Sequence, residues 1–253
     1  MTQQASKVAW FEFAGKLIQT AYAIFGEVEA PITQKGASDP KVLAKTLLAR
    51  TLSNFKGAVA STREGLVVEA RILTRCCFEN LLWIGGLAAQ GDEFVRAMFD
   101  DEARSRKVRG EFILREAYEL DEKVEQRLRA QLRDINKRSP KNKSLSPKDV
   151  AEDSVLRHAY LIYSQLSADA GHPTFSSLNR YIGKFEENGE TVRGIDIAPP
   201  PKEQELLQTL DWACNAMVGV CVGVNQIVEG TPTGQTLLGI ADEYQALTGR
   251  SAP

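Results

Sequence analysis

Residues 66–84 read Leu-Val-Val-Glu-Ala-Arg-Ile-Leu-Thr-Arg-Cys-Cys-Phe-Glu-Asn-Leu-Leu-Trp-Ile. At about 100° per residue, a helix over this stretch stacks Arg71, Arg75 and Glu79 within about 80° of one another, on successive turns. The residues that flank this stripe on the helical wheel are apolar: Val68, Ile72, Phe78 and Leu82. Because a helix that is apolar nearly all round is normally buried, we expect the three charges to lie inside the protein or to line a cleft.

Two interpretations of this stripe follow from the cost of burying charge. A buried arginine needs a partner, and Arg75 can pair with Glu79 at four-residue spacing, whereas Arg71 needs an acceptor from another helix or from a ligand. The stripe is therefore either an internal ion-pair network that fixes helix register or a cleft that binds an anionic ligand through arginine; the remaining alternative is a wholly solvated face.

A second polar group lies in the helix predicted to begin at Ser146-Pro147 and to end at Gly171. Tyr160 and Ser164 share a face of this helix, and His172 follows its last turn. Histidine titrates near neutral pH, so His172 is the candidate general acid or base; as an alternative, it caps the end of the helix.

Helical periodicity extends over most of the chain and predicts an all-α bundle of about seven to nine helices. Asn188-Gly189 between two short apolar runs predicts a small hairpin or irregular excursion near 181–198. We expect one helical domain over 1–253. Its predicted parts are a peripheral N-terminal helix at 6–28, a core at 45–230 and a C-terminal helix at 233–247.

Composition excludes several classes of protein. The formal net charge is −2 and 43% of the residues are hydrophobic, which is ordinary for a globular domain. No secretory signal and no run of 18 uncharged apolar residues occurs, so we expect no membrane partner and a cytoplasmic location. The four cysteines and two histidines lack the spacing of metal ligands, and no glycine-rich phosphate loop follows a strand; we expect no metal and no cofactor.

Two further surfaces suggest macromolecular partners. Residues 127–148 hold eight basic side chains against Asp134 alone, which makes RNA a possible partner, although no aromatic residue is interleaved to stack on bases. Gly219 and Gly223 form a small face on the long helix predicted from Pro201 to about Val228. That face admits a neighbouring helix, preferably of the same chain; the alternative is a homodimer.

The run 69–79 together with Leu48-Ala49-Arg50 resembles an uncharacterised bacterial all-helical family of unknown function. Tyr163-Ser164, His172 and the later Tyr181 extend the resemblance over roughly 45–230. It implies a helical fold and brings no activity with it.

A more remote likeness is to the HEPN helical bundles, some of which are metal-independent ribonucleases of toxin and antiviral systems. Their motif is an arginine followed four to six residues later by histidine. Here no arginine lies between Arg157 and His172. The likeness therefore implies a ribonuclease only if Arg71 or Arg75 supplies the charge from the neighbouring helix.

The leading interpretation is a helical binding protein whose charged cleft receives an anionic small molecule or nucleotide. The predicted ligand-binding residues are Arg71, Arg75, Glu79, Tyr160, Ser164 and His172. The alternative is a ribonuclease in which His172 is the acid or base and Arg75 stabilises the charge of the transition state.

Overall fold

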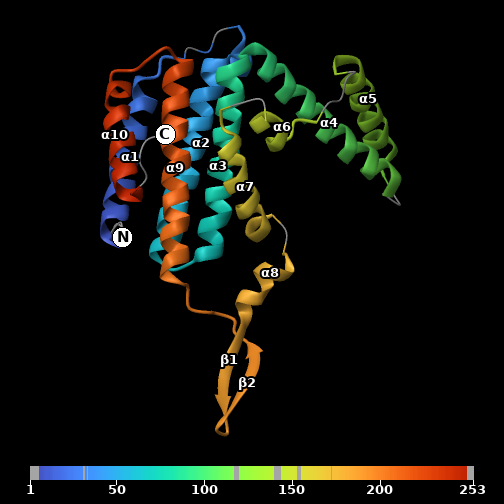
Figure 1. The fold of residues 1–253 in the computed structure, drawn as a ribbon. Helices are drawn as coiled ribbons and strands as arrows, with labels where there is room; N and C mark the ends of the chain where they lie inside the picture. Colours follow the sequence, from blue (N-terminus) through green and yellow to red (C-terminus); the bar gives the residue numbers. More distant parts are fainter. Residues whose placement is uncertain are drawn as a thin grey trace.

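The computed structural model describes residues 6–30, 32, 34–116, 120–139, 144–152, 155–171 and 173–249. Within these ranges it has ten α-helices and one two-stranded sheet, so the predicted all-α bundle with a small hairpin is confirmed (Figure 1). Two of the ten helices, α6 and α8, have only six and four residues.

The elements follow one another along the chain as a series of helices interrupted once by the hairpin. Their bounds are α1 Lys7–Glu27, α2 Pro40–Arg63, α3 Val67–Gln90, α4 Asp92–Glu116, α5 Glu122–Arg138, α6 Pro147–Glu152, α7 Arg157–Ala170, α8 Phe175–Leu178, β1 Ile182–Glu187, β2 Glu190–Ile195, α9 Glu203–Ile227 and α10 Leu237–Thr248. Short 3-10 turns are η1 Gly36–Ser38, η2 Asn179–Tyr181 and η3 Thr233–Thr236.

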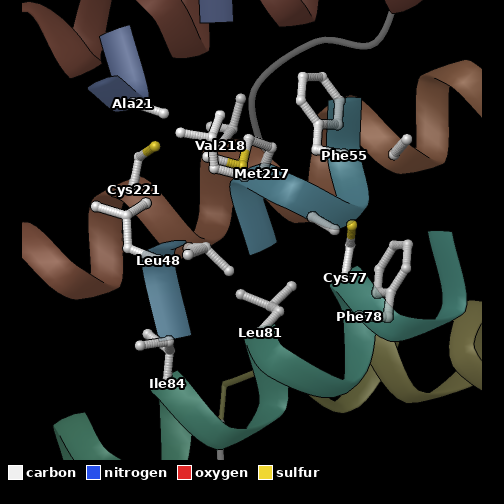
Figure 2. Packing of buried hydrophobic residues seen from close by; sticks show 14 of the residues in the cluster. Ala21, Leu48, Phe55, Cys77, Phe78, Leu81, Ile84, Met217, Val218 and Cys221 are labelled. Atoms are coloured by element: carbon white, nitrogen blue, oxygen red, sulfur yellow. The ribbon is translucent and has the colours of Figure 1, made fainter. Parts of the chain in front are cut away.

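Helices α2, α3 and α9 pack against one another and form the centre of the bundle. Helix α1 packs on α2 and α9, and α7 packs on α3. The shared interior is apolar and includes Phe55, Phe78 and Met217, all fully buried (Figure 2). This core fixes the positions of α3, α7 and α9, which carry the polar residues described below.

The predicted glycine face of α9 packs against α3 of the same chain. A Cβ atom added to Gly219 would lie 2.8 Å from Leu81 Cδ1, and one added to Gly223 would meet Ile84 more closely still. The two glycines therefore allow the close approach of α3 and α9 within the chain. A homodimer through this face stays a prediction.

The helix predicted over 147–171 is wrong as a single element, because it is divided into α6 and α7. Val155 and Leu156 form a turn between them, in which Val155 is 97% exposed. Leu156 contacts α3 at Gly85, where an added Cβ would lie 2.5 Å from its Cδ1 atom. The turn thus places an apolar side chain against α3, which helical periodicity alone does not reveal.

The predicted turn of the hairpin is confirmed at Asn188 and Gly189. Both residues have positive φ, 53° and 83°, as a two-residue hairpin loop requires. Strands β1 and β2 pair antiparallel from Ile182–Ile195 to Glu187–Glu190.

Helices α3 and α9 are long and apolar enough to cross a membrane, judged by length and composition. Both lie at the centre of the bundle, and such core helices of soluble proteins pass the same criterion. The cytoplasmic location stays a prediction.

Candidate functional site

Arg71 binds two carboxylates from other helices, and a second arginine near the hairpin binds the same two carboxylates. Its Nη1 atom donates to Asp169 Oδ2 of α7 and lies 3.1 Å from Glu205 Oε1 of α9. Arg180 of η2 binds the same two acids from the other side, at 3.2 Å from Asp169 Oδ1 and 3.1 Å from Glu205 Oε1. These four residues, named the ionic quartet here, balance two positive against two negative charges.

The quartet is largely removed from solvent and receives further support from α9. The exposed fractions of its side chains lie between 12% and 22%. Arg71 Nε also donates to Thr209 Oγ1 at 3.3 Å, and its guanidinium lies 5.8 Å from the centre of the Trp212 ring. Because each charge has partners of opposite sign, the buried network avoids the cost of an isolated charge.

Arg75, one turn further along α3, makes a separate set of contacts with α7. It donates to Tyr163 Oη at 2.6 Å, to Ser167 Oγ at 3.0 Å and to Glu79 Oε2 at 3.2 Å. These residues, the Arg75 cluster, are more exposed than the quartet: the side chains of Arg75 and Glu79 are 26% and 33% exposed. The Arg75 cluster lies at the α3–α7 interface, where Arg75 of α3 donates to two hydroxyl groups of α7 and to Glu79 of its own helix.

The Tyr163 phenol is held in its neutral form. Burial raises its pKa, and the nearby Glu79 carboxylate raises it further, while the Arg75 guanidinium acts in the opposite direction. A phenol with a raised pKa is a poor base near neutral pH. Tyr163 therefore accepts the hydrogen bond of Arg75 as a structural partner.

Two hollows lie beside the quartet, and Arg180 lines both. The inner hollow, of about 240 Å³, lies between Val68 of α3 and the segment from Asp169 to Tyr181. The outer hollow, of about 650 Å³, extends from Leu66–Glu69 to Ile197–Lys202. Its wall is mixed: apolar side chains and three prolines line it together with the charged Glu69, Arg180, Lys202 and Glu205 and the polar Ser176 and Asn179.

Arg180 has one polar atom that its neighbours leave unsatisfied. Its Nη2 atom binds both carboxylates, but its buried Nε–H finds no acceptor among the described residues. A buried donor without a partner costs free energy, of the order of 1–3 kcal/mol. The guanidinium is thus bound to both acids through Nη2, while its buried Nε–H lacks an acceptor among the described residues and the residue as a whole lines both hollows.

The predicted site residues divide between three environments. Arg71 belongs to the quartet, Arg75 and Glu79 to the Arg75 cluster, and Tyr160 stacks on Tyr163 with ring centres 6.0 Å apart. Ser164 is exposed on α7, and it lines neither hollow. His172, the candidate acid or base, lies outside the described residues.

Asp169, Arg180 and Glu205 belong to the quartet but are absent from the predicted site. Glu205 lies in the first turn of α9, where acids are common because they favour the helix N-terminus, so its position in the sequence does not mark a site. Arg180 has no local signal either, because it lies in a short turn whose position depends on the tertiary fold.

The basic segment 127–148 is partly neutralised by its own helix. Arg129, Arg138 and Lys148 pair with acids four residues away, at 2.7, 3.0 and 3.6 Å. Lys141 and Lys143 lie outside the described residues. An RNA partner for this segment stays a prediction.

A family model described as a family of unknown function, DUF5677, matches residues 41–191. The match begins in α2 and ends in β2, so it includes three members of the quartet and stops before Glu205. No curated protein and no solved structure matches the chain.

Proposed function

Since the chain belongs to the family of unknown function DUF5677, we propose its function from the geometry of its site: it binds a small ligand in the outer hollow. The ligand combines one anionic group with an apolar body. The observation that carries this proposal is Arg180, which lines both hollows, is held by two carboxylates and has a buried Nε–H donor without an acceptor among the described residues.

The anionic group follows from the donors of the hollow. Arg180 offers Nε–H, and the exposed Lys202 adds a second positive charge on the same wall. A carboxylate or a phosphate would accept from both, and arginine suits such groups because its donors are planar and permanently charged.

The apolar body follows from the rest of the wall. Leu66 and Ile197 are exposed large apolar side chains that line the hollow with Pro199–Pro201. Binding sites for small molecules are typically apolar with a few fixed polar groups. Proline and the ion-paired Arg180 have little freedom to lose, so they favour binding by preorganisation.

The quartet narrows the expected class of ligand, which was an anionic small molecule or nucleotide. Arg71 finds its acceptors in Asp169 and Glu205, and those acids neutralise both arginines. A nucleotide with several phosphates would meet Glu69 and Glu205 as well as the cations. We therefore favour a ligand with a single anionic group.

The ribonuclease alternative has less support. It needs a guanidinium that is free to stabilise a developing phosphorane charge, whereas Arg75 already donates to Tyr163, Ser167 and Glu79. Incubation of the purified protein with RNA tests it: cleavage that His172→Ala abolishes would establish it.

Thermal unfolding against a panel of carboxylates and phosphates with apolar bodies of increasing size tests the proposal. We expect a member of the panel to raise Tm of the wild type, with a smaller shift in Arg180→Lys, which keeps the charge and lacks the Nε–H donor. Lys202→Met, at an exposed position, should weaken binding without unfolding the protein.

Arg193→Met provides the matched control, because Arg193 is also an exposed cation but lies outside the lining of the hollow. It should bind as the wild type does. Equal shifts in all four proteins, or no shift with any compound, would contradict the proposal.

A further inference from the structure

The β1–β2 hairpin extends beyond the end of the helical bundle, away from the core (Figure 1). All but three of its strand residues are exposed; the partly covered ones are Gly183, Val192 and Gly194. Among the described residues, β1 pairs with no strand except β2. A two-stranded hairpin is marginally stable by itself, so additional strands would stabilise this one.

The backbone of β1 presents alternate residues to its free edge. Asp196 N–H donates to Tyr181 C=O at 2.8 Å, next to the first pair of the ladder. By the alternation of an antiparallel ladder, the odd-numbered residues of β1 then direct their backbone groups toward β2. Ile182, Lys184 and Glu186 direct theirs outward, so these residues would form the hydrogen-bonded pairs with a further strand.

The charges at this edge distinguish between the registers that a second β1 strand could adopt. A twofold axis at Lys184 would place lysine opposite lysine, and one at Glu186 would place two glutamates together; like charges directly opposite are unfavourable. An axis at Phe185 places Lys184 opposite Glu186 twice, once on each side of the axis. This register alone pairs opposite charges, and it also uses the outward-directed backbone groups.

We propose that two copies of this chain associate through an antiparallel β1–β1 pairing centred on Phe185. The product is a four-stranded sheet with twofold symmetry in which each copy uses the same edge, as closed dimers generally do. Three or more paired strands have the stability that a lone hairpin lacks.

Phe185 adds an apolar contact at the twofold axis. Its ring covers the hairpin glycines: a Cβ added to Gly194 would lie 3.0 Å from the ring, and one added to Gly183 3.1 Å. The side chain nevertheless remains 40% exposed. In the proposed register the two Phe185 residues form the close, non-hydrogen-bonded pair, with Cα atoms about 4.5 Å apart, so the rings of the two copies bury each other.

The charges within the hairpin also favour a second copy of β1 as the partner strand. Lys184 lies directly opposite Arg193 in the ladder, which is an unfavourable pair of like charges. Glu186 of a second copy would place an acid on the other side of Lys184. The outer edge of β2 offers Thr191, Arg193 and Ile195, among which no twofold register pairs opposite charges, so the β1 edge is selected over the β2 edge.

Sedimentation of the full chain at concentrations up to about 0.1 mM tests the proposal through a charge exchange. Lys184→Glu and Glu186→Lys each place like charges opposite one another twice, and each should weaken the dimer about tenfold or more. The double variant with both changes restores the opposite pairs and should restore the dimer. Arg193→Gln, which removes a cation from the same face but from the other strand, should leave the dimer intact.

A disulfide across the axis provides the second readout. Phe185→Cys brings two thiols together at a close pair and should yield a covalent dimer on oxidation, whereas Val192→Cys on β2 should not. A wild type that sediments as a monomer throughout, or single charge variants that associate as well as the wild type, would overturn the proposal. Failure of the double variant to recover association would overturn it too.

Discussion

Arg71 and Arg75 lie one turn apart on α3, yet they pair with different parts of the chain. Arg71 joins acids 98 and 134 residues away in sequence and, through them, meets Arg180. Arg75 pairs with Glu79 four residues away and with two hydroxyls of α7. The quartet therefore connects α3, α7, η2 and α9, whereas the Arg75 cluster joins α3 to α7 alone.

The helical wheel of α3 suggests two roles for its charged stripe, an ion-pair network and a ligand-binding cleft. The different contacts of Arg71 and Arg75 allow these roles to be considered separately. The Arg75 cluster combines an ion pair within α3 with two hydrogen bonds from Arg75 to α7. The quartet also joins helices through ion pairs, and one of its members, Arg180, lines both hollows. Neighbouring turns of one buried polar stripe can thus have different surroundings: Arg75 bonds within α3 and to α7, whereas the partners of Arg71 lie beside the two hollows.

The largest expected effect is that of Arg71→Met. Removal of one partner leaves Asp169 and Glu205 with only Arg180, and loss of one side of a buried ion pair typically costs about 3–5 kcal/mol. Urea unfolding of the variant measures this loss in the free energy of unfolding.

The double variant Arg71→Met with Asp169→Leu is the control for this prediction, because it tests whether the two residues are coupled. It leaves Arg180 and Glu205 as a balanced pair, so the combined loss should be smaller than the sum of the two single losses. Strictly additive losses would show that the quartet is not one coupled network.

Arg75→Met should destabilise the protein less, by about 1–2 kcal/mol. Its acid partner, Glu79, keeps access to water after the change, and the two hydroxyls can bond elsewhere. The same unfolding measurement compares it with Arg71→Met. A loss as large as that of Arg71→Met would remove the distinction between the two clusters.

The smallest effect concerns the pH dependence of Tyr163. Its pKa in the folded protein is raised above the ordinary 10.0, chiefly by burial, so the unfolded chain ionises first. The contribution of Tyr163 to the free energy of unfolding should therefore be constant well below pH 10 and should fall as the pH rises above it. Tyr163→Phe should lessen this fall in alkaline unfolding experiments; an unchanged slope would contradict the burial of the phenol.

The sequence predicts the fold class closely because periodicity and caps are local. Asp39 caps α2 by accepting from Lys41 N–H, with Pro40 at the first helical position, as its sequence indicates. The interruption at Leu120-Asp121 and the loop at Asn188-Gly189 are likewise determined by nearby residues. The turn at Val155-Leu156 is not predicted, because helical periodicity does not show the tertiary contact that Leu156 makes with α3.

The site is harder to predict from the sequence, because its contacts are tertiary as well. The wheel of α3 places Arg71 on a buried face, but it cannot identify acceptors that lie in α7 and α9. Arg180 becomes significant only when the fold brings η2 to Asp169 and Glu205. The central stripe was predictable from one helix, while the hollows beside it depend on segments that approach from distant parts of the chain.

Hydrogen–deuterium exchange in the presence of the best-binding compound of the anion panel tests the central claim most directly, because it locates the ligand. We predict slower exchange in 176–182 and 197–205, which line the outer hollow beside Arg180, and no change in 160–167 next to Arg75. Slower exchange centred on 160–167, with 176–182 unaffected, would contradict the account.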